Sequence, residues 1–91
     1  MPEIHLRVVG RVQGVGFRWF VRERAVALCL AGWVRNTRQG DVELVARGDQ
    51  PSLAALEDSV AQGPEGANVT AIHREPVDSD ISYPSPFTIE K

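Results

Sequence analysis

The spacing of hydrophobic and polar residues along the first half of this chain predicts both strands and a helix. Residues 4–8 alternate between apolar and polar side chains, a period of two that is typical of a strand with one buried face. Between residues 17 and 28 the apolar positions recur every three or four residues, which predicts a helix with one buried side. Residues 32–38 and 42–47 predict two further strands, and Gln39-Gly40-Asp41 between them is typical of a hairpin turn.

The second half predicts another helix and a fourth strand. Asp49 or Ser52 can cap the helix, and Pro51 suits its first turn because proline lacks the N–H that this turn leaves unpaired. Gly63-Pro64 ends the helix, since glycine readily adopts the conformation that follows many helices and proline cannot continue one. Residues 68–77 predict the strand. The buried stripe of this helix is expected to consist of Leu53, Leu56 and Val60.

The last residues, 81–91, predict an extended tail at an edge of the sheet, because its prolines cannot donate ladder hydrogen bonds. Phe87 and Ile89 could return to the sheet. The resulting order, βαββαβ plus a terminal strand, is that of the split βαβ, ferredoxin-like α+β arrangement: an antiparallel sheet with two helices packed on one face. A chain of 91 residues is expected to form a single domain, residues 1–91.

Composition narrows the class of protein. Apolar residues make up 43% of the chain, and no apolar run approaches the roughly 20 residues that cross a bilayer. The first residues, with an early Glu3 and no apolar stretch, are unlike a secretory signal. Cys29 is the only cysteine, which excludes an internal disulfide and a cysteine metal cluster. We expect a monomeric, cytoplasmic protein that contacts no membrane and holds no metal.

Charge is unevenly distributed, although the net charge is only −2. Residues 1–47 contain eight basic and four acidic residues, about +4, whereas residues 48–91 contain two basic and eight acidic residues, about −6. An anionic ligand is therefore expected in the first half, while the overall acidity argues against nucleic acid. Nine of the ten basic residues are arginine, which binds phosphate through a rigid fork, although genomic composition also explains such a total.

The segment GRVQGVGFR, residues 10–18, separates the first strand from the first helix. It is not a Walker loop, since Lys91 is the only lysine, and Trp19 stands where a dinucleotide fingerprint needs its third glycine. The helix that follows lacks a Ser, Thr, Asp or Asn cap and has no carboxylate in its first turn. Arg18 lies in that turn, where the helix dipole disfavours a cation by roughly 0.3–1 kcal/mol.

A bound anion would accept hydrogen bonds from the uncapped N–H groups of the helix and would compensate the charge of Arg18. Gly14 and Gly16 allow the backbone to direct N–H groups toward one point, the helix start adds further donors, and Arg18 can hold two oxygens. The alternative is a tight connection between strand and helix with a solvated arginine. These residues by themselves favour neither explanation.

Asn36 is the second candidate, because it lies two residues after Val34 and shares its face of the strand. If Val34 faces the helices, Asn36 does too, near the end of the strand. Its amide both donates and accepts hydrogen bonds and could hold a water molecule against a phosphorus atom. The commoner role of such a residue is to satisfy backbone groups beside a turn.

The two segments GRVQGVGFR and GWVRNTRQGDVE, residues 32–43, together resemble the acylphosphatase family. The first resembles the family's phosphate-binding loop with its terminal arginine. The second resembles the strand-turn-strand segment that contains the catalytic asparagine. Chain length, the βαββαβ order and GPEGANV after the second helix also match, so the resemblance covers nearly the whole chain.

The resemblance implies hydrolysis of the carboxyl–phosphate bond of small acyl phosphates, such as acetyl phosphate, 1,3-bisphosphoglycerate and carbamoyl phosphate, to a carboxylate and inorganic phosphate. No metal or other cofactor is implied. Phosphoryl binding is assigned to Arg18, and orientation of the attacking water to Asn36. The cradle, which binds phosphate through main-chain N–H groups, is matched by Gln13, Gly14, Val15, Gly16 and Phe17.

Two other functions share this fold. An RNA-binding module usually has aromatic residues on its central strands, and this chain has no such run and a negative net charge. The second alternative is a regulatory or carbamoyl-phosphate-processing domain of a larger maturation protein, but intact Arg18 and Asn36 favour hydrolysis over binding alone. Cys29 departs from the family, which commonly has glycine just past the first helix, and this predicts strain or a different cap there.

Overall fold

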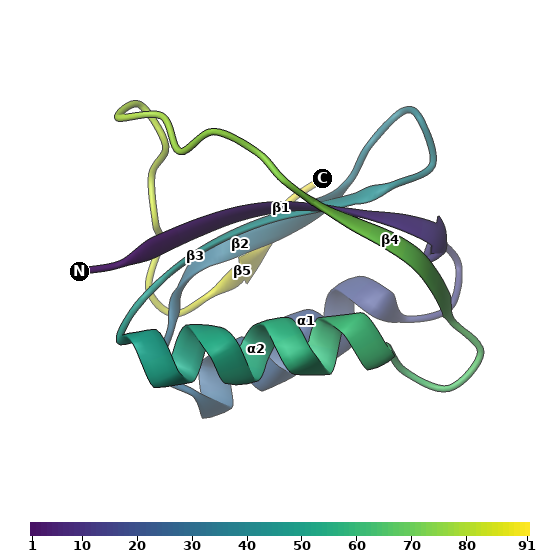
Figure 1. Ribbon diagram of the computed structural model, residues 1–91, viewed down its shortest axis with the longest axis horizontal. Coiled ribbons are helices and arrows are strands. Elements are labelled where there is room, and N and C mark those ends of the chain that lie inside the picture. The colour runs from purple at the N-terminus through teal and green to yellow at the C-terminus, as the bar shows by residue number, and fades with distance from the viewer.

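The computed structural model describes all 91 residues and has two helices on one face of a five-stranded sheet (Figure 1). In chain order the elements are β1 (Glu3–Arg11), α1 (Phe17–Ala27), β2 (Ala31–Asn36), β3 (Val42–Arg47), α2 (Gln50–Gln62), β4 (Asn68–Arg74) and β5 (Thr88–Ile89). The strands lie in the order β4-β1-β3-β2-β5. This arrangement confirms the predicted ferredoxin-like α+β fold. Neither helix has the length and apolar character needed to cross a bilayer.

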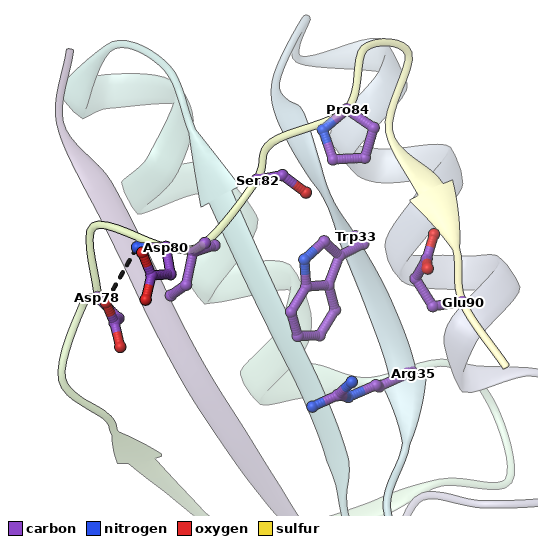
Figure 2. A pocket seen from close by; sticks show the side chains of 8 residues that line it. Trp33, Arg35, Asp78, Asp80, Ser82, Pro84 and Glu90 are labelled. Carbon is purple, nitrogen blue, oxygen red and sulfur yellow. Dashed lines mark hydrogen bonds between the residues drawn. The ribbon is translucent and has the colours of Figure 1, made fainter.

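The terminal strand makes the sheet mixed rather than wholly antiparallel. β1, β2, β3 and β4 pair antiparallel as predicted, but β5 runs parallel to β2, with Val34 opposite Ile89. A parallel neighbour requires the chain to cross over before it pairs. Residues 78–84 make part of this crossing in front of the sheet, on the side away from the helices (Figure 2). The apolar pattern of the tail indicated its return to the sheet but could not indicate its direction.

Two strands end earlier than their sequence pattern predicts. β2 ends at Asn36, two residues early, because the N–H of Thr37 donates to the Asp41 carbonyl at 2.9 Å and begins the turn. Gly40 has a φ of 91° within this turn, as the hairpin prediction requires. β4 ends three residues early, at Arg74. Asn36 is therefore the last residue of its strand, directly before the turn.

The hydrophobic core lies between the sheet and the helices, and each element directs its buried side chains into it. Val34 of β2 is completely buried, and Phe87 of the tail fills the core beside β5. Because Val34 faces the helices, Asn36 is directed to the same side. Leu28, expected in the helical stripe, is only half-buried at the end of α1. The other predicted helical positions are buried: Phe17, Val21, Ala25, Leu53, Leu56 and Val60.

Cys29 is the only residue other than glycine with a positive φ, 59°, so of the two predicted alternatives, strain or a different cap, the structure shows the strained left-handed conformation. A side chain with a Cβ costs roughly 1–2 kcal/mol in this conformation. Cys29→Gly should raise the free energy of unfolding by about 0.5–1 kcal/mol, once the larger entropy of glycine in the unfolded chain is subtracted. Urea unfolding measures the change. Cys29→Ala keeps the Cβ, so an alanine variant as stable as the glycine variant would contradict this explanation.

Candidate active site

The loop between β1 and α1 contains Gly14 and Gly16, the two glycines predicted to shape an anion site. Gly14 and Gly16 have φ values of 76° and 75°, in the left-handed region that other residues adopt only at a cost. A Cβ at either position would meet open space, so conformation rather than crowding requires glycine here. Gly16 is also the N-cap of α1. Backbone that alternates between left- and right-handed conformations directs N–H groups into one concavity that suits an anion.

The N–H groups of residues 14–19 donate no hydrogen bond within the protein, and the first donor of α1 is Phe20, which bonds to the Gly16 carbonyl at 3.0 Å. This helix has neither a side-chain cap nor an acidic residue in its first turn. In α2, by contrast, the Asp49 carboxylate accepts a hydrogen bond from the Ser52 N–H at 2.9 Å. Hydrogen bonding to Ser52, by its side chain first and then by its backbone N–H, lowers the pKa of Asp49. One helix is therefore capped from within, and the other is open to an external acceptor.

Arg18 lies half-buried in the first turn of α1 and forms no ion pair. Its five guanidinium N–H groups remain available, and its charge adds to the positive end of the helix. Such an arrangement is compensated when an anion binds between the guanidinium and the helix start. The arginines that do pair with carboxylates are Arg7, Arg22, Arg35, Arg47 and Arg74.

Asn36 has a buried side-chain oxygen, Oδ1, without a hydrogen-bond partner. Leaving such an atom unpaired costs about 1–3 kcal/mol, a cost that a bound water or ligand removes. A cavity of about 210 Å³ brings Asn36 together with Arg18 and the loop glycines. Its lining consists of Val12, Gly14, Gly16, Phe17, Arg18, Trp19, Asn36 and Ile89.

Gln13 and Val15, the other two positions of the predicted cradle, do not line this cavity. Val15 packs against the hydrophobic core. Nε2 of Gln13 donates to the carbonyls of Thr37 and Asp41, at 3.0 and 2.9 Å. These two bonds join the glycine loop to the turn that follows Asn36. The side chain of Gln13 therefore fixes the position of the glycine loop relative to the turn after Asn36.

Asp41 anchors the same turn through a cluster of charged residues that no local sequence pattern indicated. Its carboxylate accepts a hydrogen bond from Nη1 of Arg7 at 2.8 Å, and Nε of Arg7 donates to Glu75 at 3.0 Å. The hydrogen bonds to Asp41 and then to Glu75 raise the pKa of Arg7. These three residues are distant in sequence and meet only through the register of β1 with β3 and β4.

Two exposed apolar residues of the cavity were also outside the predicted site. Trp19 follows Arg18 in α1 and is 62% exposed, and Ile89 of β5 is 37% exposed. The position of Trp19 beside Arg18 was a signal available in the sequence. Nothing comparable indicated Ile89, because the parallel pairing of β5 with β2 places it there.

A second cavity, of about 340 Å³, lies on the opposite face of the sheet (Figure 2). It includes Trp33, and the guanidinium of Arg35 lies 4.7 Å from the centre of that ring. Its acidic residues are Asp78, Asp80 and Glu90. Their charge repels phosphate, and neither Arg18 nor Asn36 lines this cavity. Arg18, Asn36, Gly14 and Gly16 line the smaller cavity at the glycine loop instead.

A family model, a related sequence and a solved structure all match this chain to acylphosphatases. A family model described as Acylphosphatase matches residues 4–89. An acylphosphatase of Geobacillus kaustophilus is 42% identical over 78 residues, which cover 86% of this chain and 83% of that protein. The structure of an acylphosphatase from Coxiella burnetii matches at a TM-score of 0.86 and 41% identity, over 97% of this chain and 90% of that one. The structure of HypF from T. kodakarensis matches this whole chain with 12% of its own, at a TM-score of 0.82 and 32% identity.

Proposed function

Because this chain belongs to the acylphosphatase family and is an acylphosphatase enzyme, we propose that it hydrolyses small acyl phosphates without a metal or other cofactor. In this proposal Arg18 binds the phosphoryl group and Asn36 orients the attacking water. One observation supports it above the others. One cavity is surrounded by loop N–H groups that donate no hydrogen bond, by Arg18, which has no carboxylate partner, and by the buried Oδ1 of Asn36, which has no hydrogen-bond partner.

The phosphoryl group binds at the start of α1. Phosphoryl transfer spreads negative charge over three equatorial oxygens, and donors that already point at them stabilise the transition state without reorganising. The N–H groups of residues 14–19 supply neutral donors, and the guanidinium of Arg18 supplies two parallel charged ones. The positive end of the helix dipole adds to the attraction.

Water attacks phosphorus from the side of Asn36. Its hydrogen bond to Oδ1 of Asn36 directs a lone pair of the water toward phosphorus. The new P–O bond forms as the bond between phosphorus and the acyl oxygen breaks, and that electron pair leaves with the carboxylate. One water proton stays on the new oxygen and the other passes to a phosphoryl oxygen. An acyl phosphate dianion and water thus give a carboxylate and dihydrogen phosphate.

The cavity lining contains no histidine, aspartate or glutamate that could remove the water's proton. The chemistry tolerates this, because a carboxylate is a good leaving group and the substrate itself accepts the proton. Positioning and charge stabilisation then supply the rate enhancement. This assignment predicts no catalytic group beyond Arg18, Asn36 and the loop backbone.

We also propose that residues 1–91 act as one catalytic domain, as a cytoplasmic monomer, on small molecules rather than nucleic acid. Arg18, Asn36 and the loop all come from one chain, and no second copy is needed to complete the cavity. RNA-binding modules of this fold stack bases on the open sheet face. Here residues 78–84 pass over that face and bring Asp78 and Asp80 to it (Figure 2). Light scattering and a salt-dependent RNA-binding assay test these points.

The proposed reaction is tested by following phosphate release from benzoyl phosphate in the presence of EDTA. We expect turnover at the same rate with and without the chelator. Loss of turnover with EDTA would contradict metal independence. A folded protein that binds inorganic phosphate but releases none from acyl phosphates would contradict the proposed hydrolysis and leave only a binding site.

Gln13→Ala should lower kcat for benzoyl phosphate by about tenfold, because it removes both bonds between the loop and the turn after Asn36 and misplaces the water. The inhibition constant of inorganic phosphate should stay nearly unchanged, since Arg18 and the loop N–H groups remain. Gln39→Ala is a matched control, because Gln39 is an exposed residue of the same turn. Equal losses in kcat and in phosphate binding would contradict this positioning role.

A further inference from the structure

The cavity that contains Arg18 and Asn36 has an apolar side that the phosphoryl chemistry does not use. Trp19 and Ile89 both line it, and both are exposed. The indole of Trp19 is a large apolar surface held in water beside a site for an anion. A bound apolar group would remove that surface from water, which is favourable. The cavity is therefore suited to a ligand with one charged end and one apolar end.

The direction of the acyl group follows from in-line displacement, in which the leaving oxygen lies opposite the attacking water. In the proposed function the water is held by Asn36, so the acyl group extends away from Asn36 and over the first turn of α1. Trp19 follows Arg18 in that turn and lines the same cavity. It is the large side chain that an acyl group leaving in this direction would meet.

A larger polar cavity, of about 600 Å³, also has Asn36 in its lining and offers a different course for the acyl group. Its residues are Arg35, Asn36, Thr37, Arg38, Gln39, Glu43 and Lys91, none of them hydrophobic. Of these only Asn36 also lines the cavity at the loop. An acyl group placed there would lie on the same side of phosphorus as the water, which in-line attack forbids.

We propose that Trp19 contacts the acyl group of the substrate. The chain then prefers acyl phosphates with an aromatic or large apolar acyl group over acetyl phosphate and over those with a second charged group. This inference rests on the proposed function, because anchoring of the phosphoryl group by Arg18 is what brings the acyl group to Trp19.

The first test is the ratio of kcat/KM for benzoyl phosphate to kcat/KM for acetyl phosphate. Trp19→Ala should lower this ratio roughly three- to tenfold, the range expected when one partner of an aromatic pair is lost. Trp19→Phe keeps an aromatic ring and should retain most of the ratio. Trp33→Phe is the matched control, because Trp33 lies on the opposite face of the sheet (Figure 2). An unchanged ratio in folded Trp19→Ala would overturn the inference.

The second test measures binding without chemistry. Phenacylphosphonate resembles benzoyl phosphate with a methylene in place of the bridging oxygen, and acetonylphosphonate is its acetyl counterpart. In Trp33→Phe the only remaining tryptophan is Trp19, so its fluorescence reports this contact. We expect a saturable change with phenacylphosphonate that is clearly larger than with acetonylphosphonate or inorganic phosphate. Equal changes with all three probes would overturn the inference.

Failure of this inference and failure of the proposed function give different results. If hydrolysis depends on Arg18 and Asn36 but Trp19→Ala leaves the substrate ratio unchanged, the proposed function stands and the acyl contact is wrong. If Arg18→Ala and Asn36→Ala keep full activity, the proposed function is wrong. The acyl contact, which depends on phosphoryl anchoring, then falls with it.

Discussion

Replacing Arg18 with alanine is expected to lower kcat/KM for benzoyl phosphate by on the order of 10²–10³. The guanidinium supplies the only side-chain cation of the cavity, and no carboxylate of the protein competes for it. Its removal therefore takes charged donors from the phosphoryl oxygens in both the bound substrate and the transition state. Phosphate release measured across substrate concentrations should show a higher KM as well as a lower kcat.

Two further variants separate the role of Arg18 from a general charge effect. Arg11→Ala removes an exposed arginine that also forms no ion pair but lies outside the cavity, and it should have little effect. Arg18→Lys keeps the charge without the rigid fork and should recover only part of the activity. Equal losses in Arg18→Ala and Arg11→Ala, or full activity in Arg18→Ala, would contradict phosphoryl binding by Arg18.

Asn36→Ala is expected to lower kcat for benzoyl phosphate by about 10²-fold, because a misplaced nucleophile can cost that much. Competitive inhibition by inorganic phosphate should change little, since the loop and Arg18 are intact. The same variant should be at least as stable as the wild type toward urea, because it removes a buried oxygen that has no partner in the protein. A loss of activity without a loss of stability separates a catalytic role from a structural one.

Asn68→Ala provides the control for Asn36, because Asn68 is exposed at the start of β4 and does not line the cavity that contains Asn36. It should keep wild-type kcat. If Asn36→Ala instead weakens phosphate inhibition as strongly as it lowers kcat, Asn36 binds the phosphoryl group rather than the water. If it unfolds more easily than wild type, the amide contributes to stability and the assignment of a free Oδ1 is wrong.

Much of the fold could be predicted from local patterns, because the backbone itself sets their period. Alternation along residues 4–8 and 42–47 has the period of two that a strand imposes, and both segments are strands in the structure. The start of α2 was equally local, since Asp49 caps it through a bond to a residue only three positions away. Bounds were less accurate where a turn or a crossing competed with the pattern, as at the end of β2.

The candidate site also has some features that follow from local sequence and others that depend on contacts between distant segments. Two local facts made Arg18 and Asn36 separate candidates: an arginine in an uncapped first turn and an amide two residues beyond a buried valine. Only the resemblance to the acylphosphatase family assigned both residues to one site. The bonds from Gln13 to the turn after Asn36 were not predictable, because they join residues 24 and 28 positions apart. The charge cluster at Asp41 has the same origin, since it depends on which strands are neighbours.

By itself, the sequence determined the order of elements, the glycine loop, the uncapped start of α1 with Arg18 in its first turn, and the place of Asn36 near the end of a strand. Each of these depends on interactions within a few residues, whose geometry the peptide backbone dictates. Only the tertiary structure decided the direction of β5, the apolar wall formed with Ile89, and the absence of a partner for Oδ1 of Asn36. These features depend on contacts between distant segments, which are selected by the packing of the whole core rather than by any local pattern.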